Sequence, residues 1–255
     1  MSLAALVLAD ARFPGGGHAH SGGLEEAVAR GLVTDLVGLD AFLRGRLRTA
    51  GLVAAAFAAA AARLAEGASR PFGAAGWPAD EANPAAGGEA RSRAPGPCDV
   101  AAWADLDAEL DARTPSPAQR AASRAQGRAT LRAVRLAWPS PVLDALVAVH
   151  PRPHHPLLLG AVTGLDGARP AEAARCAGYL AVTGPASAAV RLLGLDPLAV
   201  NALVVALGPD LAHVVGAATA EGAVAALPAP GAPVLDLMAQ SHVRHHREQV
   251  RLFAS

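Results

Sequence analysis

Three histidines near the C-terminus have the spacing of a metal site. His242, His245 and His246 stand at positions i, i+3 and i+4, so one turn of a helix would present all three on one side. Imidazole is a good ligand for zinc, nickel or copper. The alternative is a solvated helix end, because arginines flank the trio and only Glu248 could add a carboxylate ligand. We favour the solvated helix end and keep a His-rich metal-binding helical module as the alternative function.

A glycine-rich loop near the N-terminus contains two more histidines. Three consecutive glycines follow Pro14, and His18 and His20 come directly after them. A Walker phosphate loop needs a lysine, and the chain has none, whereas a dinucleotide fingerprint needs a preceding strand within a βαβ unit. We therefore predict neither kind of nucleotide site here. We expect the two histidines to be polar loop residues, with metal binding as the alternative.

No group of residues suggests nucleophilic catalysis. The stretch Gly184–Ser187 lacks the final glycine of a nucleophile elbow. Cys176 falls on an alanine-rich helical face and is expected in the core. His154 and His155 stand between two prolines, which is typical of a turn followed by a helix start. The sequence thus predicts a protein that is not an enzyme and has no cofactor.

An arginine stripe is the strongest charged feature. Arginine recurs at every fourth position, which places one helical face at Arg120, Arg124, Arg128 and Arg132. This stripe could dock an acidic partner or a nucleic acid backbone. It could also pair with the five acidic residues between Asp99 and Asp111. We favour self-pairing for part of the stripe, and we expect no nucleic acid partner because the net charge is +0 and aromatic residues are 4% of the chain.

The composition favours an all-α fold. Alanine and leucine are abundant, isoleucine is absent, and 52% of the residues are hydrophobic. Helical periodicity, caps and breakers predict helices at Leu3–Leu8, Leu24–Val28, Leu52–Leu64, Asp99–Asp111, Pro156–Leu165, Asp210–Leu227 and Val234–Phe253. Three further helices are predicted after an N-cap at Thr34, from Pro117 onward, and from Pro197 to Gly208. A helix at Pro170–Leu193 is predicted to kink or break at Pro185.

Residues 1–255 are predicted to form one helical-bundle domain. Residues 69–97 are rich in proline, glycine and alanine and are predicted to be a long disordered loop. The start of the chain lacks the basic region of a signal peptide. The longest apolar run, residues 51–62, is shorter than the roughly 20 residues that span a bilayer. We therefore expect a cytoplasmic protein that does not bind membranes.

Five stretches in chain order resemble the urease accessory protein family UreF. Residues 9–25 are similar to the family's Pro-x-Gly-Gly-Phe-x-His/Tyr-Ser-x-Gly-Leu-Glu signature, with His18 in the place of the phenylalanine. The other four are similar to a Ser-x-x-x-Gly-Arg helix, a His-Pro-x-x-x-Gly segment, a Val-Arg-Leu helix and the family's C-terminus. In this chain they are Ser123–Arg128, His155–Gly160, Val190–Leu192 and Arg251–Ser255.

The resemblance implies an all-helical homodimer without catalytic activity. Members of the family bind the accessory protein UreD, called UreH in some organisms, and the GTPase UreG, and they help to deliver nickel to apo-urease. On this resemblance, residues 250–255 form a flexible tail that orders only on docking to UreD. The residues expected to contact partners are Gly16, His20, Ser21, Gly23, Glu25, Arg124, Arg128, Arg191, Arg251, Leu252 and Phe253.

Overall fold

The computed structural model describes residues 2–10, 12–15, 21–66 and 96–252, with the backbone alone for residues 242 and 244–252. All regular elements in these ranges are helical, which confirms the all-α prediction. They are α1 (Leu3–Ala9), α2 (Leu24–Ala29), α3 (Leu36–Arg46), the π-helical turn η2 (Leu47–Gly51), α4 (Leu52–Ala65), α5 (Val100–Ala112), α6 (Pro117–Ala137), α7 (Pro141–Val149), α8 (His155–Leu165), α9 (Pro170–Leu193), α10 (Pro197–Ala206), α11 (Gly208–Ala218), the 3-10 turn η3 (Val224–Ala226) and α12 (Pro233–Leu252).

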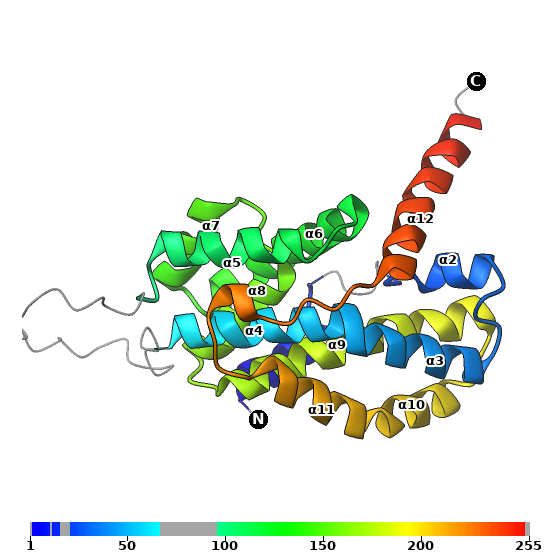
Figure 1. Cartoon of the computed structure of the whole chain (residues 1–255), viewed down its shortest axis with the longest axis horizontal. Coiled ribbons are helices and arrows are strands. Elements are labelled where there is room, and N and C mark those ends of the chain that lie inside the picture. The colour runs from blue at the N-terminus through cyan, green and yellow to red at the C-terminus, as the bar shows by residue number, and fades with distance from the viewer. Residues whose placement is uncertain (1, 11, 16–20, 67–95, 253–255) are drawn as a thin grey trace, which may run out of the picture.

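The core is built around the alanine-rich helix α4, which packs against α8, α9 and α11 (Figure 1). Small residues let the backbones of α4 and α8 touch. A Cβ atom added at Gly160 would lie 2.2 Å from the carbonyl oxygen of Ala58, and one added at Gly164 would lie 2.5 Å from that of Ala62. The glycine of the His155–Gly160 stretch therefore serves the close crossing of these two helices.

Helices α3 and α4 form one continuous rod, whereas the sequence predicted two separate helices. The turn η2 joins them with five residues of π-helix. Its N-terminal neighbour α3 is capped by Asp35, whose side chain accepts a hydrogen bond from the Gly38 N–H at 2.8 Å. The predicted cap, Thr34, is thus wrong by one residue. An inserted π-turn shifts the register of the side chains that follow it, and such turns are frequent at functional sites.

Three other expectations differ from the structure. Helix α9 continues through Pro185 to Leu193, so it does not break there, because one lost hydrogen bond is tolerated where the proline is itself packed into the core; the kink at Pro185 stays a prediction. Helix α11 ends at Ala218 and does not reach Leu227. Helix α7 was not predicted, although Ser140 and Pro141 give it the same cap and first-turn proline that correctly located α6.

Two segments, the rod of residues 36–65 and α9, have the length and composition of membrane-crossing helices. The apolar run at residues 51–62 was predicted to be too short to span a bilayer. That prediction was wrong about the length, because α3, η2 and α4 join into one longer helix. Of the most apolar part of each segment, 61% and 44% respectively is buried inside the protein. Much of this apolar surface therefore packs in the core.

Helix α12 contacts α6 and α2 and then leaves the bundle (Figure 1). Its first turns are anchored by Met238, which is 7% exposed, and by Asp236, which accepts a hydrogen bond from Gln119 Nε2 at 3.1 Å. The helix extends to Leu252. Residues 253–255 and nearly all of the predicted loop 69–97 lie outside the described residues, so their predicted flexibility stays a prediction.

Candidate functional site

The arginine stripe pairs in part with the acidic helix that precedes it, as the sequence predicted. Arg124 is 8% exposed, and its guanidinium donates to both carboxylate oxygens of Asp107 at 3.1 and 2.8 Å. It also donates to Asp111 Oδ2 at 3.0 Å and to the carbonyl oxygen of Arg152 at 3.1 Å. These bonds tie α5 and α6 together and fix the segment that leads into α8.

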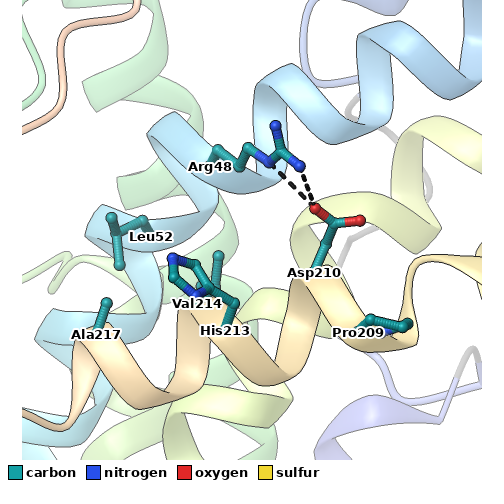
Figure 2. A pocket seen from close by; sticks show the side chains of 7 residues that line it. All are labelled: Arg48, Leu52, Pro209, Asp210, His213, Val214 and Ala217. Carbon is teal, nitrogen blue, oxygen red and sulfur yellow. Dashed lines mark hydrogen bonds and ion pairs between the residues drawn. The ribbon is translucent and has the colours of Figure 1, made fainter.

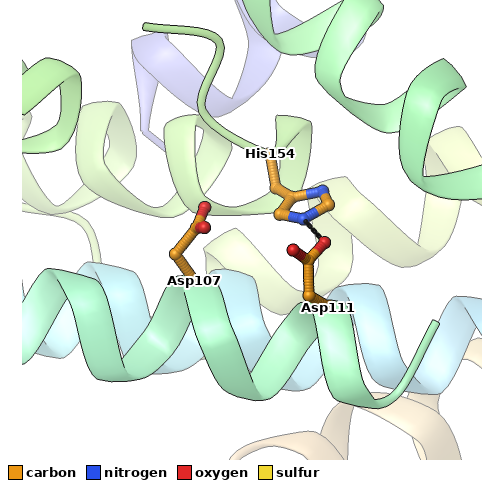
Figure 3. Close-up of side chains that lie close together, drawn as sticks. All are labelled: Asp107, Asp111 and His154. Atoms are coloured by element: carbon orange, nitrogen blue, oxygen red, sulfur yellow. Dashed lines mark hydrogen bonds and ion pairs between the residues drawn. The ribbon is translucent and has the colours of Figure 1, made fainter. Parts of the chain in front are cut away.

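His154 completes this network from the N-terminus of α8 (Figure 3). Its Nε2 lies 2.8 Å from Asp111 Oδ1 and its Nδ1 lies 3.0 Å from Ser123 Oγ. Burial, and secondarily the charge of Arg124, lower the pKa of His154 below its usual 6.5. Because a carboxylate can only accept, we assign the ring proton to Nε2, so that Nδ1 accepts from the serine hydroxyl.

The ligand-capable atoms of Asp107, Asp111 and His154 lie within 4.8 Å of one another, as they would around a metal ion. The sequence did not predict this cluster. However, the guanidinium of Arg124 already holds both carboxylates and supplies the compensating positive charge. We therefore interpret the cluster as a charge-balanced network that stabilises the fold.

The glycine of the Ser123–Arg128 stretch also has a packing role. A Cβ atom at Gly127 would lie 1.8 Å from the carbonyl oxygen of Pro153 and 3.1 Å from the backbone nitrogen of His155. The close approach of another backbone was the explanation that the sequence suggested for a glycine inside this helix. Two of the five family-like stretches are thus joined by internal contacts.

The outer part of the arginine stripe consists of Arg128 and Arg132, whereas Arg120 is partly buried and forms an ion pair with Asp111 at 3.9 Å. Four residues exceed one 3.6-residue turn by about 40°, so a stripe of period four winds around the helix. Arg120 donates to the carbonyl oxygens of Thr114 and Pro115 at 2.7 and 3.0 Å. Arg128 and Arg132 are exposed and have no ion-pair partner among the described residues. Partner contact by Arg128 stays a prediction, whereas the contacts of Arg124 are internal.

A cleft with a volume of about 820 Å³ brings together residues from several family-like stretches. Its walls come from α2, α6, α9 and α12, and its lining includes Ser21, Gly23, Glu25, Ser123, Gln126, His155 and Arg191. Gly16, His20 and Phe253 lie outside the described residues, and so do the side chains of His242, His245, His246, Arg251 and Leu252. Ser21, Gly23 and Glu25 therefore share one site with Arg191, which is far from them in the sequence.

Arg46 also lines this cleft, and the sequence analysis did not single it out. Its Nε donates to the carbonyl oxygen of Ala181 at 2.9 Å, and its Nη1 donates to that of Gly22 at 2.7 Å. Gly22 has a φ of 62°, and a Cβ atom there would lie 2.6 Å from Arg46 Cζ. Burial lowers the pKa of Arg46 to about 10. The only signal in the sequence is the alternation of arginines along the end of α3.

The neighbouring arginines point to the opposite side of the rod, toward α11. Figure 2 shows Arg48 directed at Asp210, with a nitrogen–oxygen distance of 2.5 Å. Arg44 also pairs with Asp210. The hydrogen bond from Arg48, followed by the charges of Arg48 and Arg44, lowers the pKa of Asp210. A shallow groove of about 530 Å³ lies beside this pair, with Leu52 and His213 in its lining.

A sequence model of the UreF family matches residues 33–208, which is more than half of the chain. The chain belongs to the UreF family. It is 44% identical over 250 residues to the urease accessory protein UreF of Mycolicibacterium vanbaalenii, covering 98% of this chain and 97% of that protein. It is 42% identical to that of Mycobacterium sp. (strain JLS), with the same coverage. It is 40% identical to that of Mycobacterium tuberculosis, covering 100% of this chain and 99% of the relative.

Membership of the UreF family accounts for the order of the stretches identified in the sequence. The matched range includes Ser123–Arg128, His155–Gly160 and Val190–Leu192. In the structure the first two of these pack against each other around Gly127 and His154. The UreF relatives are accessory proteins of urease by name, so a role in urease maturation follows for this chain.

Proposed function

We propose that this protein is a cytoplasmic, non-enzymatic maturation factor that bridges UreD, or UreH, and the GTPase UreG while the nickel centre of urease is assembled. The observation that carries the proposal is the similarity of nearly the whole chain to proteins named urease accessory protein UreF, at 40 to 44% identity. A scaffold of this kind acts by binding and positioning other proteins. Neither bond breaking nor a bound cofactor is part of the proposal.

Two features of the molecule support a scaffold role. The large cleft combines the glycine-rich loop residues Ser21 and Gly23 with Arg191. Helix α12 leaves the bundle toward its C-terminal end (Figure 1). We propose that the cleft and the end of α12, including Arg251, Leu252 and Phe253, are contact surfaces for accessory proteins. We also propose that the protein is a homodimer. Sedimentation equilibrium of the purified chain tests this oligomeric state.

Co-expression with the cognate UreD and UreG tests the proposal. We expect the full chain to retain both proteins through affinity purification and gel filtration. Deletion of residues 250–255 should abolish UreD retention, because an apolar pair in a polar tail is the expected anchor. A matched variant has glycine and serine at the same six positions, so it keeps the length of the tail but lacks the apolar pair. If the deletion variant retains UreD as well as the full chain does, the proposed role of the tail is wrong.

Nickel binding by His242, His245 and His246 is the second candidate. The backbone of α12 is helical over this segment, so the i, i+3, i+4 spacing places the three positions within about one turn. Equilibrium dialysis with nickel compares the full chain with a variant that has alanine at all three positions. Equal binding by the two proteins excludes this site.

A further inference from the structure

Arg46 is largely withdrawn from water without a carboxylate to balance its charge. Other inward-facing arginines of the chain have such a partner: Arg124 pairs with Asp107, and Arg113 pairs with Glu109. Arg46 has no carboxylate within ion-pair distance among the described residues, and its two hydrogen-bond acceptors there are neutral carbonyl oxygens. The two N–H groups of its Nη2 have no acceptor among the described residues.

The surroundings of Arg46 form a binding surface of mixed character. Small apolar residues of the rod and of α9 line the cleft near it, including Ala50, Ala54 and Ala181. Hydroxyl and amide groups are contributed by Thr183, Ser187, Gln119 and Gln126. Sites of this size usually have apolar walls and a few polar groups that fix orientation. A volume of about 820 Å³ is ample for an extended peptide segment with one acidic side chain.

The carboxylates described along the cleft leave Arg46 uncompensated. Asp10 is engaged by Arg12 at 2.7 Å, and Asp236 accepts a hydrogen bond from Gln119. Glu25 also lines the cleft, and neither Glu25 nor Asp236 lies within ion-pair distance of Arg46. No described carboxylate of the cleft therefore balances the charge of Arg46 at ion-pair distance.

We propose that Arg46 receives a carboxylate from an acidic segment of a partner accessory protein that lies in the cleft. This inference rests on the proposed function, because it presumes that accessory proteins bind here. The carboxylate would accept charge-assisted hydrogen bonds from Nη2, while Nε and Nη1 keep their bonds to Ala181 and Gly22. Those two bonds hold the guanidinium in place before the partner arrives, so little side-chain entropy is lost on binding.

The energetic reason is that the free protein already bears the cost of desolvating this cation. In an ordinary interfacial ion pair both charges lose water on association, and that loss offsets much of the attraction. Here Arg46 has already lost part of its water in the free protein, so more of the cost falls on the incoming carboxylate. We therefore expect Arg46 to contribute strongly to the affinity for the partner. Breaking the ion pair should increase the dissociation rate of the complex.

The test supplies the carboxylate from within the chain. Ala50 lies four residues after Arg46 and lines the same cleft. Ala50→Glu places an acid beside Arg46 and should compete with the partner, whereas Ala50→Gln has the same size without the charge. We expect the Kd for purified cognate UreD or UreG to be at least tenfold higher for A50E than for A50Q. Arg46→Gln should weaken binding of the same partner to a similar extent.

Arg175→Gln is the control for loss of one positive charge, because Arg175 is exposed on α9 outside the cleft. Thermal unfolding identifies any variant that does not fold, and the comparison then uses Ala54→Glu with Ala54→Gln. If the unmodified chain binds both partners and the Glu and Gln variants bind them equally, this inference is overturned and the proposed function stands. If the unmodified chain binds neither partner, the proposed function is overturned together with the inference.

Discussion

Arg124 and Arg46 are both largely buried, and their surroundings differ in charge. Arg124 lies among Asp107, Asp111 and the ring of His154, so its charge is balanced within the chain. Arg46 meets two carbonyl oxygens. The first arrangement stabilises the fold, because each buried group has a partner. The second leaves Arg46 without an ion-pair partner among the described residues.

The comparison shows that membership in a family-like stretch does not by itself mark a contact surface. Arg124 belongs to such a stretch and is used internally, whereas Arg46 belongs to none and lines the cleft. Charge balance separates the two roles more clearly than burial does.

The largest effect is expected from Arg124→Leu. The substitution leaves two carboxylates beside a buried histidine without their cation, and breaking a buried pair in this way costs about 3 kcal/mol. Urea denaturation at pH 7.5 measures the free energy of unfolding. Arg128→Leu, on the exposed part of the same helix, should change it by less than about 0.5 kcal/mol. Equal effects of the two variants would contradict an internal role for Arg124.

A slightly smaller effect is expected from Gly127→Ala. The added methyl group would overlap the carbonyl oxygen of Pro153, so α6 and the segment before α8 must separate, at a cost of about 2 kcal/mol. Gly45→Ala is the matched control, because Gly45 lies inside α3 with open space around it. That control should stabilise the protein by roughly 0.5 to 1 kcal/mol. Destabilisation by both variants to the same extent would show that packing at Gly127 is not the cause.

Arg46→Leu should destabilise the protein less than Arg124→Leu does. The variant loses two hydrogen bonds, but it also removes an unbalanced charge from a poorly hydrated site, so we expect a loss under about 1.5 kcal/mol. The same urea titration measures it. A loss as large as that of Arg124→Leu would mean that Arg46 is primarily a structural residue.

The smallest effect is a pH dependence that originates at His154. Its pKa is below 6.5 in the folded protein, so below pH 6.5 the unfolded chain binds a proton that the folded protein does not. Stability should therefore decrease as the pH falls from 6.5 toward the pKa of the folded state, by at most about 1.4 kcal/mol per pH unit. The difference between the unmodified chain and His154→Gln, measured at several pH values, isolates this contribution. A difference that does not vary with pH excludes it.

Helices with local signals were predicted well from the sequence. Ser116 and Pro117 located the start of α6, and the acidic residues from Asp99 onward located α5. The joined rod was not predicted, because a π-turn leaves no clear pattern in the residue types. The end of α11 was missed for a related reason: residues 219–227 are still mostly small or apolar after the helix ends.

The sequence by itself determined the all-α fold class, the family and the self-pairing of the arginine stripe, since these depend on helical periodicity, residue order and residues close in the chain. Tertiary structure alone decided which charged residues meet across the molecule. It brought Gly22 and Ala181 to Arg46 across intervals of 24 and 135 residues, and it placed Asp111 43 residues away against His154. Such pairs depend on how helices pack, and packing leaves no local spacing that a sequence pattern can reveal.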